Sequence, residues 1–460
     1  MIKFPDTFVW GASTASYQIE GSVEADGRAP SIWDTFSRTP GAVVGGHTGD
    51  DACDHYRRYR DDVALMAGLG LHAYRFSIAW PRVRPGGDGP TNERGLDFYD
   101  RLVDELCQYG ITPMPTLYHW DLPQALEDRG GWANRRTAEA FAEYATAVHD
   151  RLGDRVQSWT TLNEPWCSAY LGYGNGVHAP GRRDPAAAFA AVHHLLLAHG
   201  LGTQALRAAG ARSVGLVVNP VAVRPADPAS AADADAVRLI DGLHNRIFLG
   251  PVLGDGYPAD VLEHLTRLVD PTWLGESDEK IIAAPIDLLG INYYNPVYVA
   301  SRPGAPEVDG RYPGVRDVEF RDPTGPTTAM GWEIDPTGLG ELLRRLHRDH
   351  PGTPLWVTEN GAAFDDRITG DHIPDDDRVS YLDGHLRAVH AALSDGVDVR
   401  GYLAWSLLDN FEWAEGYHKR FGLVHVDYRT QRRTLKDSAL WFRSVIARNA
   451  LPSQVTDPPA

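Results

Sequence analysis

Eight short runs of apolar, β-branched and aromatic residues recur along the chain, and each run ends in a polar or aromatic residue. Continuous apolar runs are typical of parallel strands, because helices cover both faces of a parallel sheet and bury its side chains. The pattern therefore predicts eight parallel strands, over residues 8–13, 73–78, 112–119, 158–164, 214–219, 286–294, 355–359 and 401–405.

Between several of these runs, apolar residues recur every three or four positions, which is the spacing of an amphipathic helix. Such stripes predict helices over residues 56–66, 141–152 and 379–393. Thr137 is the expected N-cap of the second helix, and Gly153 its C-terminal stop. Strand and helix in repeated alternation predict an α/β fold with a closed (β/α)8 architecture, a TIM barrel.

We expect a single catalytic barrel domain over residues 1–450, followed by a flexible C-terminal tail over residues 451–460. Residues 300–330 are rich in proline, glycine and charge and show no sustained period, so we expect a long surface loop there. Because this segment follows the sixth strand, it belongs to the extended loops at the C-terminal face, where barrel enzymes build their active sites.

Composition and charge narrow the classes of function. Of the 460 residues, 43% are hydrophobic and 23% charged, which is typical of a globular protein. The net charge of -18 would repel a phosphate backbone, so no nucleic-acid partner is expected. No apolar run approaches the about 20 residues that span a bilayer, so no membrane partner is expected. Three scattered cysteines and an N-terminus without an apolar stretch predict a cytoplasmic location, and a homo-oligomer is left open.

Two of the predicted strands end in a glutamate, Glu164 in the fourth and Glu359 in the seventh. The carboxyl ends of barrel strands point into the active-site mouth, and these two strands lie across it from each other. Cleavage of a glycosidic bond requires two such carboxyl groups, one to protonate the leaving oxygen and one to act as nucleophile or base. Pro165 keeps Glu164 out of the α region. Adjacent strand residues point to opposite faces, so Asn163 and Glu164 can both reach one ligand only if the pleat is broken, and we predict a bulge or twist there.

A metal-dependent barrel hydrolase is the alternative class of enzyme, because 18 histidines are available as ligands. The sequence lacks the ligand spacing of such enzymes, since the first strand holds no His-x-His and the chain no His-Glu-x-x-His motif. The adjacent His193 and His194 lie in a stretch rich in alanine and leucine that is predicted to be helical. We therefore expect no metal and no cofactor.

Motifs around the two glutamates resemble those of a known family. Residues 161–165 (Thr-Leu-Asn-Glu-Pro) and 358–361 (Thr-Glu-Asn-Gly) are similar to the acid/base and nucleophile motifs of glycoside hydrolase family 1, the retaining β-glucosidase and β-galactosidase family. Residues 8–21, 118–123 and 405–413 resemble further motifs of that family and stand in the same order along the chain. The resemblance thus extends over nearly the whole sequence.

The resemblance implies roles for five residues in catalysis. Glu359 matches the nucleophile, and Glu164 matches the general acid that later acts as base. Asn163 matches a residue that hydrogen-bonds the sugar 2-hydroxyl. Arg75 and Tyr294 match groups that hold the charge of the nucleophile, so we expect them to lower the pKa of Glu359. The implied mechanism is a double displacement through a covalent glycosyl-enzyme.

The resemblance also implies a binding site for a small carbohydrate. Residues that match the site of the non-reducing sugar are Gln18, His119, Trp120, Trp405, Glu412, Trp413 and Phe421. Residues that match positions around the leaving group are Trp166, His178 and Trp332. The carboxyl group of Glu412 disfavours a 6-phosphosugar, because it repels phosphate. The implied substrates are therefore oligosaccharides or glycosides with a terminal β-D-glucosyl residue, and also a β-D-galactosyl or fucosyl residue.

Two alternatives to a hydrolase remain in view. A non-catalytic sugar-binding relative would characteristically lack one of the two acids, and both are present here. An enzyme that transfers its sugar mainly to an alcohol or a second sugar would carry the same motifs. The sequence therefore argues against the first alternative and does not separate the second from hydrolysis.

Overall fold

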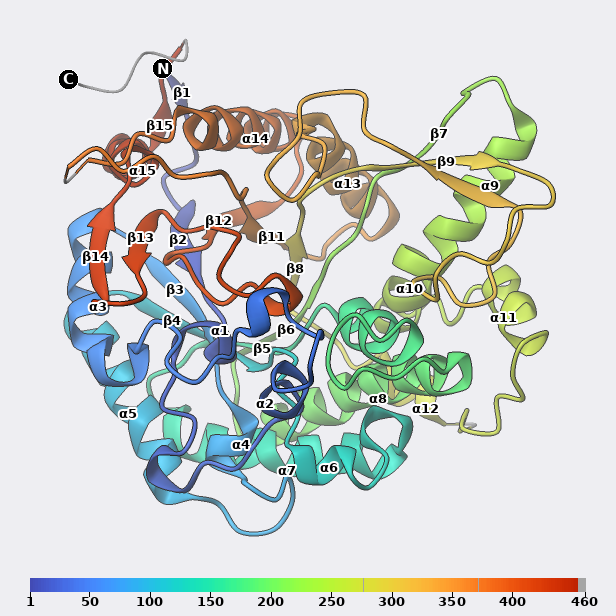
Figure 1. The fold of residues 1–460 in the computed structure, drawn as a ribbon, viewed down its shortest axis with the longest axis horizontal. Coiled ribbons are helices and arrows are strands. Elements are labelled where there is room, and N and C mark those ends of the chain that lie inside the picture. The colour runs from blue at the N-terminus through green and yellow to red at the C-terminus, as the bar shows by residue number, and fades with distance from the viewer. Residues whose placement is uncertain (276, 371, 454–460) are drawn as a thin grey trace.

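Eight parallel strands form a closed barrel at the centre of the protein (Figure 1). The computed structural model describes residues 1–275, 277–370 and 372–453. All eight strands predicted from the apolar runs are present and follow one another around the barrel in sequence order, which confirms the predicted fold. They are β2 (Val9–Ser13), β3 (Ala73–Ser77), β4 (Thr112–Tyr118), β5 (Ser158–Asn163), β6 (Ser213–Val218), β8 (Leu288–Asn292), β11 (Leu355–Asn360) and β12 (Val399–Trp405).

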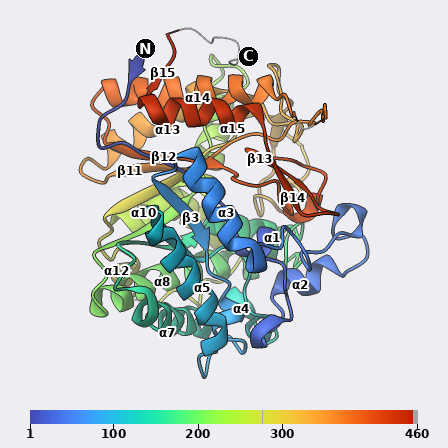
Figure 2. The ribbon, with the colours of Figure 1, turned by 90° about the vertical axis from the view of Figure 1, so that its left-hand side faces the viewer.

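Long helices surround the barrel (Figure 1), and α3, α5 and α15 cover the side that faces the viewer in Figure 2. The long helices are α3 (His55–Leu69), α5 (Glu93–Gln108), α7 (Arg135–Leu152), α8 (Pro185–Ala208), α13 (Pro336–Asp349), α14 (Asp376–Ser394) and α15 (Asp437–Arg448). Shorter helices lie in the connections: α1 (Ser16–Ile19), α2 (Ile32–Ser37), α4 (Trp80–Val83), α6 (Gln124–Glu127), α9 (Ala231–Asp241), α10 (Ile247–Leu253), α11 (Ala259–Thr266) and α12 (Asp278–Ile282).

The three predicted helices are present as α3, α7 and α14, but the predicted N-cap of α7 is wrong. The Asn134 side chain accepts a hydrogen bond from the backbone N–H of Arg136, so the helix begins about one turn earlier than expected. The Thr137 hydroxyl lies inside the first turn and donates to the backbone oxygen of Gly131. Asparagine and threonine both favour N-cap positions, and here the earlier of the two takes it. Gly153 ends the helix as predicted.

Helix α8 departs from the expectation that no segment is apolar enough to cross a membrane. Among the helices of the described residues, it alone reaches that length and apolarity. Its most apolar window is 83% buried inside the protein, where the helix packs against α7 and α12. A core helix that is covered on nearly all sides has no need of a polar face, which explains its composition.

The segment predicted as an irregular surface loop contains regular structure. Strand β10 (Val318–Arg321) lies within it and pairs with β9 (Val297–Ser301), which pairs in turn with β7 (Val223–Pro225). This small sheet lies beside the barrel strands in Figure 1. Its strands are too short, and their burial too uneven, to stand out from the surrounding proline and glycine residues.

The two ends of the chain meet in a short antiparallel pair. Strand β1 (Ile2–Lys3) pairs with β15 (Ala450–Leu451), and a hairpin of β13 (Val424–Asp427) and β14 (Arg432–Leu435) precedes α15. Leu451, with which the predicted tail begins, is buried in this pair, so the ordered part of the chain extends beyond residue 450. Residues 452 and 453 are also described, and the remainder of the predicted tail, residues 454–460, lies outside the described residues.

Candidate active site

A cavity of about 420 Å³ opens at the carboxyl ends of the barrel strands. Twelve of the fifteen predicted site residues line it: His119, Trp120, Glu164, Trp166, His178, Tyr294, Trp332, Glu359, Trp405, Glu412, Trp413 and Phe421. The other three, Gln18, Arg75 and Asn163, are buried and hydrogen-bond to lining residues. The structure therefore brings all fifteen predicted residues to one place, although they come from every part of the sequence.

Glu164 follows directly after β5, at a break in the regular strand. Its φ of 46° lies in the left-handed region, and the register between β5 and β6 shifts between Thr160 and Asn163. Such a conformation costs free energy in a residue other than glycine and is common where function needs a particular side-chain direction. This break is the bulge predicted from the sequence, and it lets both Asn163 and Glu164 contact the same neighbouring amide.

Glu359 lies near the end of β11 and is almost completely buried. Arg75 on β3 donates to its Oε1 atom over 2.6 Å, and the Tyr294 hydroxyl donates to its Oε2 atom over 2.6 Å. The next turn requires Gly361, because a Cβ atom there would lie 1.6 Å from the backbone oxygen of Trp405. The turn after Glu359 therefore lies close against the end of β12, which carries the cavity-lining Trp405.

Asn292, at the end of β8, connects the two glutamates. Its amide nitrogen donates to Glu164 Oε1 over 2.6 Å and to Asn163 Oδ1 over 3.0 Å. The same side chain is near enough to Glu359 to lower its pKa through a hydrogen bond. Both carboxyl groups therefore meet at a single amide, as two opposed groups around one substrate must.

The surroundings of the two glutamates separate their proton affinities. Burial and the nearby charge of Glu359 raise the pKa of Glu164 to about 8. Burial also raises the pKa of Glu359, although Arg75, Tyr294 and Asn292 act in the opposite direction. Arg75 and Tyr294 thus lower the pKa of Glu359 as expected, but desolvation outweighs them, so the net shift is upward. Since Glu359 pairs with a guanidinium and Glu164 accepts only from an amide and a thiol, a proton shared by the two resides on Glu164.

The cavity wall formed by the residues predicted to bind the non-reducing sugar, called the sugar wall below, combines aromatic rings with polar groups. Trp120 packs against Trp413 with 4.6 Å between ring centroids, and His119 lies 5.9 Å from Trp405. Gln18 donates to Glu412 over 3.3 Å. Burial and the charges of Glu359 and Glu164 raise the pKa of Glu412 to about 8. Three carboxyl groups in one buried cavity repel one another, so they are not all ionised at neutral pH.

Two polar atoms of this wall lack a hydrogen-bond partner among the described residues, Gln18 Oε1 and His119 Nδ1. Both are buried, and burial together with Arg75 keeps the pKa of His119 well below its ordinary value, so its ring is neutral. His119 Nε2 is hydrogen-bonded to the Asn163 amide over 3.1 Å. Buried polar atoms of this kind are costly unless a ligand or water satisfies them.

The three residues predicted around the leaving group, Trp166, His178 and Trp332, also line the cavity. Trp332 lies 5.4 Å from Tyr294 between ring centroids, and Trp166 stacks on His244 at 4.3 Å. His178 lies 5.3 Å from Trp120 between ring centroids, and burial lowers its pKa to about 3, so it is neutral. All three side chains are therefore aromatic and uncharged at neutral pH.

Several lining residues were not predicted, among them Asn292, Cys167 and His244. Asn292 carries a usable signal, since it stands near the carboxyl end of a predicted strand, where barrel enzymes build their active sites. Cys167 stands two residues after the motif that ends at Pro165, and its Sγ atom donates to Glu164 over 3.1 Å. His244 lies in a helical stretch far from any strand end and carries no signal of this kind.

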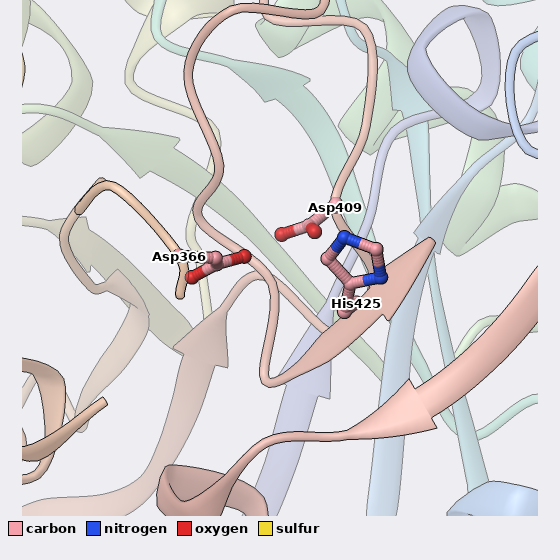
Figure 3. A group of neighbouring side chains, drawn as sticks. All are labelled: Asp366, Asp409 and His425. Carbon is pink, nitrogen blue, oxygen red and sulfur yellow. The ribbon is translucent and has the colours of Figure 1, made fainter. Parts of the chain in front are cut away.

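One group of side chains resembles a metal site, and Figure 3 shows its members, Asp366, Asp409 and His425. The ammonium of Lys436 lies 2.8 Å from an oxygen of Asp366 and 2.8 Å from an oxygen of Asp409. Arg420 adds a second cation, 2.6 Å from Asp409. Because protein cations already balance both carboxylates, a metal ion would have to displace the Lys436 ammonium.

A (β/α)8 barrel with two opposed, buried carboxyl groups in one sugar-sized cavity is the arrangement of the barrel glycoside hydrolases. Comparison with known proteins identifies the family. Residues 1–451 match the model of glycosyl hydrolase family 1, and the chain belongs to this family.

Relatives of known activity match the chain over nearly its full length. It is 56% identical to the thermostable β-glucosidase B of Thermobispora bispora, over 98% of this chain and 92% of that protein. It is 50% identical to the bifunctional β-D-glucosidase/β-D-fucosidase of Bifidobacterium breve, over 96% and 98% of the two chains. Among solved structures, the β-glucosidase of Thermotoga maritima in complex with glucoimidazole superposes with a TM-score of 0.93 at 46% identity, over 98% and 100% of the chains.

Proposed function

We propose that the protein is a retaining β-glucosidase that hydrolyses terminal, non-reducing β-D-glucosyl residues through a covalent glycosyl-enzyme. The observation that carries this proposal is the asymmetric pair of glutamates. Glu164 holds a proton at neutral pH, whereas Glu359 is ion-paired with Arg75, and both meet at Asn292. Two carboxyl groups of unequal proton affinity in a single cavity are what cleavage of a glycosidic bond requires, and membership of glycosyl hydrolase family 1 supports the retaining form of that reaction.

In the first step, Glu359 attacks the anomeric carbon and Glu164 gives its proton to the leaving oxygen. Arg75 and Tyr294 hold the attacking carboxylate in place through both of its oxygens. The charge of Glu359 disappears as the new carbon–oxygen bond forms. Since that charge is one cause of the raised pKa of Glu164, the pKa of Glu164 then falls.

In the second step, Glu164 acts as a base. Its lowered pKa leaves it ionised, so it takes a proton from water while the water oxygen attacks the anomeric carbon. The bond to Glu359 breaks, and its electrons return to the carboxylate beside Arg75. Two inversions at one carbon give net retention of the β configuration.

The sugar wall supports a neutral hexose as the bound residue. Gln18 Oε1 and His119 Nδ1 are buried without a partner among the described residues and can bond to sugar hydroxyls. Trp405 and Trp413 offer aromatic faces to the apolar side of the ring. Because a relative at 50% identity is named as both a β-glucosidase and a β-fucosidase, we include β-fucosides. We also include β-galactosides, since a galactosyl residue can use the same hydroxyl contacts.

A phosphorylated sugar fits the cavity poorly. Its described lining contains the carboxyl groups Glu164, Glu359, Glu412 and Glu415, and Arg311 is its single lysine or arginine. Arg311 adjoins Tyr312, whose ring lies 5.9 Å from that of Trp166 between centroids. The field in the cavity therefore favours neutral substrates such as cellobiose and related oligosaccharides.

A panel of nitrophenyl glycosides tests the proposal. We expect the β-glucoside to be cleaved, the β-fucoside and β-galactoside to follow, and the α-glucoside to be inert. The first product seen by proton NMR should be the β anomer. An α anomer as first product, or no hydrolysis of any β-glycoside, would contradict the proposal.

Transfer of the sugar to an acceptor other than water is a second outcome of the same covalent intermediate. The aromatic leaving-group end, with Trp166 and Trp332, is suited to bind such an acceptor. Product ratios at increasing alcohol concentration measure the balance. We propose that water is the main acceptor, so hydrolysis should exceed transfer when no alcohol is added.

We also propose a cytoplasmic location. All three cysteines, Cys53, Cys107 and Cys167, are free thiols, as is usual in a reducing compartment. Fractionation of the source cells followed by an activity assay tests the location. Activity found mainly outside the cytoplasm would overturn it.

A further inference from the structure

Cys167 lies beside the acid/base glutamate and contacts it directly. It begins the π-helical segment η4 (Cys167–Gly174), three residues after Glu164, and it lines the cavity. Its Sγ atom donates to Glu164 Oε2 over 3.1 Å. The Asn219 amide donates to the same sulfur over 3.6 Å. Because the sulfur accepts from Asn219, its own hydrogen is directed at Glu164.

We propose that Cys167 is a positioning residue for Glu164, whose S–H group holds the Oε2 atom and stabilises the carboxylate as the proton leaves. This inference rests on the acid/base role proposed for Glu164. It gives the thiol a part in proton transfer without making it a nucleophile.

The two oxygens of Glu164 have different partners. Asn292 donates to Oε1 over the short distance of 2.6 Å, so Oε1 acts as the carbonyl oxygen of the protonated acid. The acidic proton is then on Oε2, the oxygen beside Cys167. A hydroxyl oxygen is a poor acceptor, so the S–H contact is weak before the reaction and strengthens as the carboxylate forms.

The proton balance of the step is simple. The proton on Oε2 passes to the glycosidic oxygen, which takes the electron pair of the broken bond to the anomeric carbon. Glu359 forms the new bond to that carbon. Cys167 keeps its own proton throughout, since burial raises the pKa of the thiol well above its ordinary range.

Other groups also act on Glu164 and set the background for the thiol. Glu359 on β11 raises its pKa, and Arg75 on β3 lowers it. Tyr294 and Glu412 face the same cavity and interact electrostatically with Glu164. Removing the S–H donor leaves all four in place, so a change in the titration of Glu164 can be assigned to the thiol.

The test is Cys167→Ala, with Cys167→Ser as the conservative variant. We expect the alkaline limb of the kcat/KM profile of Cys167→Ala to move up by about half a pH unit, because its carboxylate has lost a donor. We expect kcat/KM to fall about 3- to 10-fold for an unsubstituted phenyl glucoside, which needs its leaving oxygen protonated. A dinitrophenyl glucoside, which does not, should change less than about 2-fold. Serine should keep the alkaline limb near that of the natural protein, since its hydroxyl is also a donor.

Matched controls separate this role from packing. Cys107→Ala removes an exposed thiol on α5 and should change neither the pH limb nor the leaving-group dependence. If Cys167→Ala does not fold, Asn219→Ala provides a second variant, because it frees the thiol to turn and should move the limb in the same direction by a smaller amount. An unchanged alkaline limb in the folded variant, or equal shifts for alanine and serine, would overturn the proposal. Failure of the natural protein to cleave any aryl β-glucoside would instead overturn the proposed function.

Discussion

Arg75 and Glu359 form a buried ion pair, with 2.6 Å between Nη1 and Oε1. This pair makes the two active-site glutamates unequal, and the inequality has a pH signature. Loss of the proton from Glu164, whose pKa is about 8, should end activity on the alkaline side. Protonation of Glu359, whose pKa burial raises above its ordinary value, should end it on the acid side. A kcat/KM profile should therefore be bell-shaped, with its optimum on the mildly acidic side of neutrality.

The variant Glu164→Gln separates the two limbs. It cannot lose a proton, so its alkaline limb should disappear while the acid limb remains. Its kcat/KM should fall by about 10² to 10⁴ on substrates with poor leaving groups. A profile of the natural protein that is flat between about pH 4 and 9 would contradict the assignment of both acids.

Replacing Arg75 should shift the acid limb. In Arg75→Met, Glu359 loses the cation that opposes the effect of burial on its pKa, so the acid limb should move up by about 1 to 3 pH units. Arg82→Met is the matched control, because Arg82 is also buried and pairs with Glu20 over 2.7 Å outside the cavity. Equal shifts of the acid limb in the two variants would show that the effect is general destabilisation.

Glu412 should make the protein less stable as pH rises. Its pKa is about 8 when folded and near the ordinary 4.5 when unfolded, so the folded state holds a proton that the unfolded state has lost between these values. Glu412→Gln has no titratable group at this position, so it does not lose stability as the pH rises through this window. We expect this variant to be more stable than the natural protein by about 2 to 4 kcal/mol above pH 8 and to show no such gain below about pH 4.5.

Urea unfolding at both ends of this pH range measures the effect. Glu415→Gln is a suitable control, because this neighbouring carboxyl is less buried. A gain for Glu412→Gln that does not depend on pH would contradict the explanation. Glu412→Gln should also bind sugar more weakly, since it loses a carboxyl oxygen at the sugar wall.

The ammonium of Lys436, rather than a metal ion, should balance the charges of Asp366 and Asp409. Removing it in Lys436→Met leaves Asp366 and Asp409 without their shared ammonium, which should cost about 3 to 5 kcal/mol of stability. Because Asp409 precedes the segment that carries Glu412, the KM of this variant should also rise. A chelator should leave the activity of the natural protein unchanged. Loss of activity on chelation, restored by a divalent cation, would contradict this view of the cluster.

Much of the fold can be predicted from local patterns in the sequence. The barrel strands are buried on both faces, so their apolar runs are continuous and easily seen, and the ends of those runs locate Glu164 and Glu359. The N-cap of α7 was missed because Asn134 and Thr137 are both suitable, and the choice depends on how the preceding turn packs. Strand β10 was missed because its pairing with β9 is not a local property.

The site was predicted unevenly for a related reason. Family motifs located residues that line the cavity, but the balance of forces on Glu359 depends on how deeply it is buried, which no motif states. Asn292 and Cys167 act through hydrogen bonds to Glu164 that follow from the bulge after β5 and the start of η4. Contacts of this kind are set by three-dimensional packing rather than by residue spacing.

The most direct test of the paired-glutamate mechanism is to trap and map the covalent intermediate. In Glu164→Ala, a dinitrophenyl β-glucoside needs no acid for the first step, whereas the second step lacks its base, so the glycosyl-enzyme should accumulate. Intact mass spectrometry should show one added glucosyl unit, and peptide mapping should place it on Glu359. A glucosyl unit on any other residue, or no adduct while dinitrophenol is still released in a burst, would contradict the mechanism.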